Sequence, residues 1–317
     1  MAMKKGFIYL SVVVILLIIM MTVFYVYQFY QPGQKDDAIE TRIKTVNFFV
    51  EDFIEDSERA GYISGFRTFI ALEEYISEKG TYLNDTEEIF KEVFLNGSYG
   101  DFTSGIINES TFSQYLERVK IKARELGISM NVDIISIKLS HSDPWNVQVD
   151  VSTNIVLTDV KGLASWNFSE VIVVNVPIEN LKDPIYTVGT LGRFESFIVE
   201  GNITDFVGPN NNTDNLKEHI ENFYYKAAPE KAPSFLMRYE GNFSNSTYGI
   251  ESIVDISFLE KQEDITIYTS RSVVDYIYFS GMLTTNYCNF QNMPSWFKID
   301  DLHLTDYELT GLSYSSC

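Results

Sequence analysis

The sequence predicts an α+β fold, in which an N-terminal transmembrane helix and a helical stalk are followed by an antiparallel β-rich ectodomain. Residues 7–30 form an uninterrupted run without a charged side chain. Apolar residues then recur at helical spacing as far as residue 126, and from residue 132 the spacing changes to the alternation of strands. We therefore expect four segments: a cytoplasmic tip with a membrane helix (1–31), a helical region (34–127), a β meander (128–200) and a C-terminal part (201–317).

The apolar run is long enough to span a membrane. At the rise of an α-helix it measures about 36 Å, against roughly 30 Å for the hydrocarbon core of a bilayer. A cleaved secretory signal would have a shorter apolar core and a small-residue cleavage site, which residues 28–31 do not offer. An uncleaved signal-anchor fits the length. Lys4 and Lys5 precede the run and acidic residues follow Lys35, so the positive-inside bias places the N-terminus in the cytoplasm and residues 31–317 outside the cell membrane.

A more specific interpretation starts from Lys4-Lys5-Gly6, directly before the apolar helix. Two lysines and a glycine at this place resemble the class III signal of archaeal type IV pilins and pilin-like proteins. The resemblance implies cleavage after Gly6, a mature chain that begins at Phe7, and a helix that can pack with other subunits in a filament core. That family usually has a glutamate at the fifth mature position, where this sequence has Ser11, which favours a minor or pilin-like role over that of a major pilin.

The helical region is predicted from periodicity and capping residues. Pro32-Gly33 is expected to interrupt the helix that leaves the membrane, and apolar residues then line one face over 36–57. In pilins a long N-terminal helix likewise has an apolar half and an amphipathic half. The amphipathic helix is expected to pack on its own ectodomain or against a neighbouring subunit. Further helices are predicted at 62–79, at 86–95 behind Asp85, and at 112–126, where Thr111 and Gln114 have capping-box spacing.

The pattern after residue 127 predicts an antiparallel meander of strands. The first strand begins near Val132, and its alternation slips by one residue at Ile134-Ile135, which indicates a bulge. The alternating run 147–157, the β-branched run 171–178 and the segment 194–199 are the further strands that we expect.

The C-terminal part is predicted to combine one helix with several strands. The stretch 200–215 is rich in Asn, Gly and Asp and is expected to be a loop, followed by a helix over 214–227. Residues 228–317 are predicted to be β-rich, with strands at 235–239, 250–258, 265–268 and 273–279. The segments 232–252, 272–281 and 293–300 resemble stretches of uncharacterised archaeal membrane-anchored surface proteins, which implies a location but no activity.

The two cysteines, Cys288 and Cys317, both lie on the side predicted to be outside the cell, where thiols oxidise. Their separation does not match the Cys-x-x-Cys spacing of redox or zinc sites. We expect one disulfide that ties the C-terminus to the domain, contributing about 3–4 kcal/mol in the chain-entropy model.

Asn-x-Ser/Thr glycosylation motifs are frequent, and all of them follow the membrane segment. They begin at Asn84, Asn96, Asn108, Asn167, Asn202, Asn211, Asn242 and Asn245. Either these asparagines carry N-linked glycans on surface loops, as expected of an archaeal surface glycoprotein, or they are only polar turns.

Composition excludes some partners. The formal net charge of −20 makes nucleic acid and anionic lipid headgroups unfavourable ligands. Aromatic residues make up 15% of the chain, which favours packed cores over disorder. Trp145, Trp166 and Trp296 could form a sugar-binding face or could simply pack in the core.

No local signature of catalysis or cofactor binding is present, so we predict no catalytic residue, no cofactor and no metal site. The histidines lie far apart and are expected at the surface or at helix caps: His141, His219 and His303. If any ion were bound, a hard cation would be the best candidate, near Asp300, Asp301 and Asp306 or near Asp205 and Asp214. These acids lack the spacing of a calcium loop, and solvated side chains are the simpler explanation.

These patterns together predict a pilin-like archaeal surface glycoprotein with a structural, adhesion or filament-assembly role, anchored by its N-terminal helix. The alternative is a single-pass ectodomain that does not polymerise and binds a glycan or solute for a membrane partner. An extracellular hydrolase would require folding to bring a histidine to a serine, or to group acids in a deep cleft.

Overall fold

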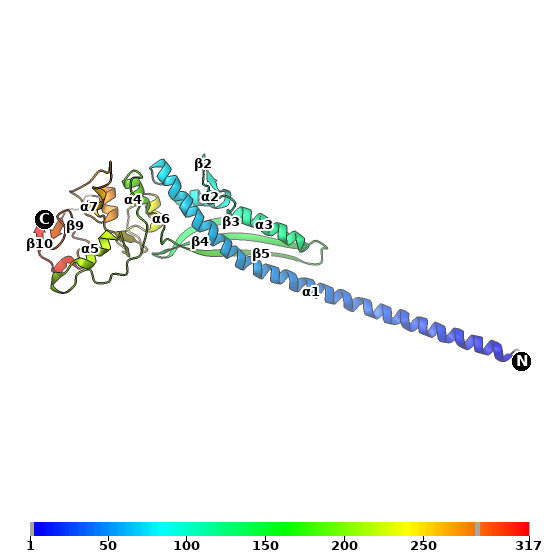
Figure 1. The fold of residues 1–317 in the computed structure, drawn as a ribbon. Coiled ribbons are helices and arrows are strands. Elements are labelled where there is room, and N and C mark those ends of the chain that lie inside the picture. Colours follow the sequence, from blue (N-terminus) through cyan, green and yellow to red (C-terminus); the bar gives the residue numbers. More distant parts are fainter. Residues whose placement is uncertain (1–2, 283–285, 317) are drawn as a thin grey trace.

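The computed structural model describes residues 3–282 and 286–316, with the backbone alone for 3–5, 29–38 and 315–316. It contains helices and antiparallel sheets, which is consistent with the predicted α+β class and its N-terminal apolar helix. Figure 1 shows the free end of helix α1 (Met3–Lys79), a helix-and-sheet layer around its other end, and a less regular C-terminal part beyond that layer. The two ends of the chain therefore lie at opposite ends of the molecule.

Helix α1 runs without a break from Met3 to Lys79, so the predicted interruption at Pro32-Gly33 is wrong. The predicted helices 36–57 and 62–79 are parts of this one helix. A proline in a helix interior removes one backbone donor and costs about 3 kcal/mol. That cost is local, and the turns on both sides keep their own hydrogen bonds, because extending a helix is favourable once it has formed.

The sheet beside α1 is a three-stranded antiparallel meander in the order β3 (Ile128–Asp143), β4 (Asn146–Asp159) and β5 (Ser165–Pro177). Its pairing matches the prediction, and the register shift between Ile134 and Ser136 confirms the expected bulge. Every second residue of β4 is buried, so one face of the sheet is turned toward the helices.

The second half of α1 lies across this sheet, mainly along β5 (Figure 1). Its buried side chains share one hydrophobic core with the strands: Val46, Phe53, Phe69, Leu72 and Ile76. Two glycines allow the helix to approach closely. A Cβ at Gly61 would lie 2.7 Å from Cγ2 of Val174, and one at Gly65 would lie 3.1 Å from Cγ2 of Val176. The helix thus packs on the sheet of its own chain.

Two shorter helices pack beside α1, and their capping residues match the sequence prediction. Helix α2 (Thr86–Asn96) begins at Asp85, whose side chain accepts a bond from the backbone of Glu88, and ends at Gly97 in the left-handed conformation. Helix α3 (Phe112–Glu125) has the predicted capping box of Thr111 and Gln114. The short strands β1 (Ser98–Tyr99) and β2 (Phe102–Thr103) form a hairpin between these helices.

The C-terminal part consists of short elements joined by long irregular segments. Its helices are α4 (Pro184–Gly189), α5 (Asp214–Glu221), α6 (Phe235–Tyr239), α7 (Ile256–Leu259) and α8 (Asp275–Ser280), with 3₁₀ turns η1 (Pro209–Asn211) and η2 (Leu309–Gly311). Its strands are β6 (Tyr225–Ala227), β7 (Ile250–Ser252), β8 (Tyr287–Phe290), β9 (Ile299–Asp300) and β10 (Tyr314–Ser316). Strand β6 pairs with β7, and β8 pairs with both β9 and β10.

Most strands predicted for residues 228–317 are wrong. Segment 235–239 is helix α6, and most of 273–279 lies in helix α8. Segment 194–199 makes only an isolated bridge through Phe197, and the helix expected over 214–227 ends at Glu221. Aromatic and β-branched residues suggested strands here, but strand propensity mainly measures how well a side chain packs on a half-buried surface. In these segments the side chains belong to helices of one or two turns and are buried there.

The close approach at Gly61 leads to a first prediction. Replacing it by leucine (Gly61→Leu) should destabilise the folded chain by about 1–3 kcal/mol, because the added side chain overpacks the interface with Val174. Glu58 lies one turn away on the exposed face of α1, and Glu58→Leu should change stability by less than about 0.5 kcal/mol. Denaturant unfolding of both variants in detergent measures the difference. Equal stability would show that the helix does not contact the sheet at this point.

Candidate functional site

The free end of α1 is the first candidate site. One span within the described residues is long and apolar enough to cross a membrane: Gly6–Gln28, with 23 residues, a mean hydropathy of 2.9 and no buried side chain. Gly6 and Phe7, at the predicted cleavage point, lie exposed in the first turns of this helix, whereas the side chains of Lys4 and Lys5 are outside the described residues. The hydroxyl of Ser11 donates to the carbonyl of Phe7 at 2.9 Å, so the helix backbone satisfies this polar group inside the apolar span.

We call the described residues after Lys79 the head, and the head contacts α1 near its middle at Arg42. Its Nε lies 2.5 Å from Oδ1 of Asp159 at the end of β4, and its Nη2 donates to the carbonyl of Gly127 at 2.7 Å. This ion pair lowers the pKa of Asp159. One turn further along, the carbonyl oxygen of the Asn47 side chain accepts a bond from Nε1 of Trp166 at 3.1 Å. These contacts belong to the start of the docked half of α1.

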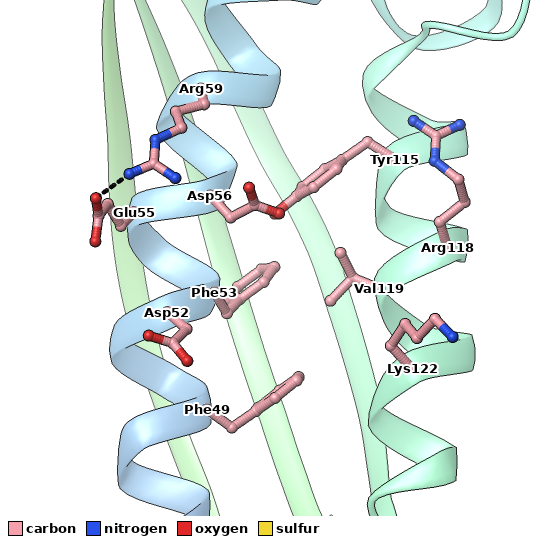
Figure 2. Close-up of a pocket in the computed structure, with 10 residues that line it drawn as sticks. All are labelled: Phe49, Asp52, Phe53, Glu55, Asp56, Arg59, Tyr115, Arg118, Val119 and Lys122. Atoms are coloured by element: carbon pink, nitrogen blue, oxygen red, sulfur yellow. Dashed lines mark hydrogen bonds and ion pairs between the residues drawn. The ribbon is translucent and has the colours of Figure 1, made fainter.

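A groove of about 440 Å³ runs between α1 and α3 (Figure 2). Phe49, Phe53 and Val119 give it an apolar floor, with acidic side chains and Arg59 on the α1 wall and basic side chains on the α3 wall. Burial raises the pKa of Tyr115 to about 12, and its hydroxyl lies 3.1 Å from that of Ser57. None of the residues lining this groove is a histidine or a cysteine.

A buried ion-pair network lies at the centre of the C-terminal part. The guanidinium of Arg238 is completely buried, and its Nη1 lies 2.5 Å from Oδ2 of Asp183 and 2.9 Å from Oδ2 of Asp275. Its Nη2 donates to the carbonyl of Ile250. Burial raises the pKa of Asp275 to about 6. The network joins α4, α6, β7 and α8, and we interpret its role as structural.

A second polar cluster surrounds His303. Its Nδ1 lies 2.7 Å from Oδ1 of Asp300, and its Nε2 lies 3.1 Å from the hydroxyl of Tyr276 and 3.3 Å from Oε2 of Glu251. Burial by itself would lower the pKa of His303, but the hydrogen bond with Asp300 and the negative charge of Glu251 raise it to about 9. A cavity of about 600 Å³ adjoins the cluster and is lined in part by Tyr276, Asp300 and His303.

The other histidines also differ from the surface positions expected of them. His219 is buried against the rings of Phe206 and Tyr307, and burial lowers its pKa to about 4. His303 is buried as well, so the surface prediction is wrong for both. His141 is half-buried, and its Nε2 accepts a long bond from the backbone of Leu236. Side-chain burial of this kind depends on contacts far apart in the sequence, which no local pattern reveals.

The two sets of acidic residues considered as cation ligands differ in burial and in ion pairing. Asp300 is buried, Asp301 is exposed, and Asp306 pairs with Lys231 at 2.5 Å. Asp205 and Asp214 are both exposed, as solvated acids would be. The described residues that could share an ion are Glu251, His303 and Asp306, a set that includes one of the predicted acids and two residues that the sequence did not single out for this role.

The three tryptophans pack against the hydrophobic core from separate parts of the chain, which favours the packing interpretation: Trp145, Trp166 and Trp296. All eight glycosylation-motif asparagines are exposed: Asn84, Asn96, Asn108, Asn167, Asn202, Asn211, Asn242 and Asn245. Their exposure is what glycosylation requires, and whether they carry glycans stays a prediction.

The predicted disulfide involves Cys317, which lies outside the described residues, so this pairing stays a prediction. Its partner Cys288 is buried on β8. The neighbouring strand β10 pairs with β8 and brings Ser316 opposite Asn289, next in sequence to Cys288. The backbone of Ser316 thus lies close to that of Cys288 in the sheet.

Comparison with known proteins does not identify a family for this chain. No protein-family model matches the chain, and neither a curated protein nor a solved structure resembles it. The functional argument therefore depends on the residues and geometry of this chain alone.

The buried network around Arg238 gives a second prediction. Arg238→Met should destabilise the fold by about 3–5 kcal/mol, because Asp183 and Asp275 would keep buried charges without their cation. Arg193→Met is the matched control, since Arg193 forms an exposed pair with Asp264 at 3.6 Å, and its loss should cost at most about 1 kcal/mol. Thermal and denaturant unfolding measure both changes. Similar small effects in the two variants would contradict a buried, charged network.

Glu73 on α1 gives a prediction about pH. Burial raises its pKa to about 8, although its Oε1 accepts a bond from the backbone of Lys182. In the unfolded chain this carboxyl loses its proton near pH 4.5, so the folded state is increasingly disfavoured between about pH 4.5 and pH 8. Glu73→Gln stays neutral while keeping the acceptor. The variant should gain stability over the parent across this range, on the order of 3 kcal/mol by pH 8. A difference that is constant with pH would contradict the raised pKa.

Proposed function

We propose that this chain is a membrane-anchored, pilin-like surface protein of archaeal type, with a structural, adhesion or filament-assembly role. One observation carries the proposal. Helix α1 is continuous, but one half is an exposed apolar rod over Gly6–Gln28 and the other half is docked in the head.

The exposed half needs an apolar environment. Burying apolar surface is worth about 25 cal/mol per Å², so a rod whose side chains are exposed along its whole length is strongly driven out of water. A span of 23 residues matches a bilayer, and the same surface can pack against identical helices in a filament core. Both environments use the same residues, so a chain released from the bilayer could move from one to the other.

The direction of insertion follows from charge. Lys4 and Lys5 lie before the span, and the head beyond it is strongly acidic. The positive-inside bias then places the head outside the cell. The exposed glycosylation motifs of the head support the same side.

The resemblance to class III signals implies a cleavage after Gly6 that would turn a membrane anchor into a filament subunit. Lys4-Lys5-Gly6 directly precedes the apolar rod, and removal of these lysines would leave the helix held only by its apolar surface. The division of α1 into an apolar and an amphipathic half also resembles pilins. Ser11 in place of the family's usual glutamate favours a minor or pilin-like subunit.

A second function has one observation in its favour. The cavity of about 600 Å³ beside His303 is lined in part by Tyr276, by the acids Asp300 and Asp301, and by Lys231. Such a mixture of an aromatic face and polar groups suits a glycan or a small polar solute. In that case the chain would be a fixed single-pass ectodomain that captures a ligand for a membrane partner.

The N-terminal residue of the native protein distinguishes these functions. Intact-mass and N-terminal peptide measurements on cell membranes and shed filaments should find Phe7 as the first residue. Gly6→Leu should block this processing and leave the lysines on the chain, whereas Ala2→Leu, upstream of the lysines, should be processed normally. A native chain that starts at Met1, Ala2 or Met3 would contradict the pilin-like proposal and favour the fixed ectodomain.

A further inference from the structure

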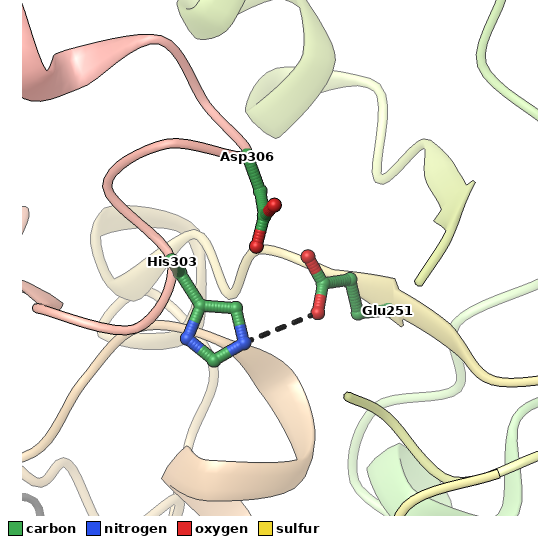
Figure 3. Close-up of side chains that lie close together, drawn as sticks. All are labelled: Glu251, His303 and Asp306. Atoms are coloured by element: carbon green, nitrogen blue, oxygen red, sulfur yellow. Dashed lines mark ion pairs between the residues drawn. The ribbon is translucent and has the colours of Figure 1, made fainter. Parts of the chain in front are cut away.

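Three side chains from separate parts of the C-terminal region converge beside the cavity. Glu251 comes from β7, and His303 and Asp306 come from the turns that follow β9 (Figure 3). One ligand atom from each residue lies within 4.8 Å of the other two. The sequence separates Glu251 from the other two by some fifty positions, so only folding brings the set together.

The burial of Glu251 is the observation that points to a ligand. This side chain is fully buried, and neither of its carboxylate oxygens makes a hydrogen bond with any described residue. Its closest charged neighbours are Nε2 of His303 at 3.3 Å and Nζ of Lys226 at 3.8 Å. A buried carboxylate normally has its lone pairs satisfied by close donors or by a metal ion. Here both oxygens face the space shared with His303 and Asp306.

The imidazole of His303 is held in a fixed orientation. Asp300 Oδ1 lies 2.7 Å from its Nδ1, and the other oxygen of Asp300 accepts a bond from the hydroxyl of Ser272 at 2.6 Å. A carboxylate that accepts the Nδ1–H of a histidine directs the Nε2 lone pair to the opposite side, which is the usual support of a metal-binding imidazole. In this structure Nε2 points toward Glu251 (Figure 3).

We propose that Glu251, His303 and Asp306 form a binding site for a divalent transition-metal ion, with Zn²⁺ as the best match and Asp300 as a positioning residue. One imidazole nitrogen and two carboxylates are ligands that Zn²⁺ accepts, whereas Ca²⁺ and Mg²⁺ take oxygen ligands. A site with three protein ligands leaves a position for water or for a group bound in the adjoining cavity. The inference goes beyond the proposed function and does not depend on how the N-terminus is processed.

Two lysines compete for the same carboxylates and set a limit on the charge of the site. Lys231 lies 2.5 Å from Oδ2 of Asp306, and Lys226 lies 3.8 Å from Oε1 of Glu251. A metal ion that binds Nε2 displaces its proton, and with the imidazole then neutral the three carboxylates outnumber the two ammonium groups, so the cluster offers a negative charge that balances the cation. Both lysine side chains are partly exposed and can turn toward solvent when an ion enters.

Zn²⁺ titration of the full chain in detergent, after removal of metal by a chelator, tests the site. Calorimetry should find one saturable site per chain. Glu251→Gln and Asp306→Asn should each weaken binding at least tenfold, and Asp300→Asn should weaken it about 10- to 100-fold, as loss of a histidine's supporting carboxylate does in metal sites. Glu308→Gln is the matched control, because Glu308 lies in the same series of turns but is exposed and outside the ligand set, and it should bind like the parent.

A spectroscopic readout separates positioning from a general loss of structure. Co²⁺ in place of Zn²⁺ should give visible absorption bands in the parent chain, and Asp300→Asn should shift these bands while Asp300→Glu restores them in part. Unfolding curves of the metal-free variants check that each one folds. If Glu251→Gln fails to fold, Asp306→Asn, which changes a half-buried side chain, carries the test. Absence of saturable binding in the parent, or equal affinity in parent and Asp306→Asn, would overturn the proposal.

Discussion

The docking of the second half of α1 on the β3–β5 sheet is the contact on which the rest of the structure depends. It buries one face of the helix from Val46 to Ile76, and it gives the meander the cover that a three-stranded sheet needs to be stable. Gly61 and Gly65 allow this contact because a larger residue would meet the valines of β5. Since α1 is one continuous helix, the docked half also sets the direction in which the apolar half leaves the head.

The C-terminal part is stabilised in a different way. Its helices and strands are short, so backbone hydrogen bonds within them contribute little to its stability. Buried polar side chains hold these short elements together instead. Arg238 joins four short elements through two carboxylates and the carbonyl of Ile250, and His303 is held between Asp300 and Glu251. Such groups are costly to bury unless each is matched, which gives this region a specific arrangement despite its irregular backbone. The incompletely matched member, Glu251, is therefore the one that indicates a ligand.

Local signals in the sequence predicted the local features of the fold. The capping box of Thr111, the αL end at Gly97 and the bulge at Ile134-Ile135 each arise from neighbouring residues, and the meander follows from simple alternation. Pro32-Gly33 was misleading because a helix can continue past one missing hydrogen bond. The helices at Phe235 and Asp275, and the convergence of Glu251 with His303, depend on contacts between distant residues, for which a single sequence carries no local pattern.

Hydrogen–deuterium exchange of the full chain in lipid nanodiscs tests most directly whether α1 has one half in an apolar phase and one half in the head. We expect two protected blocks, one over Gly6–Gln28 through the bilayer and one from Val46 to Ile76 through docking on the sheet. Transfer of the chain to a dilute denaturant that spares the bilayer should remove protection from the second block before the first. Rapid exchange across residues 6–28 in the intact nanodisc, or loss of both blocks together, would contradict the account.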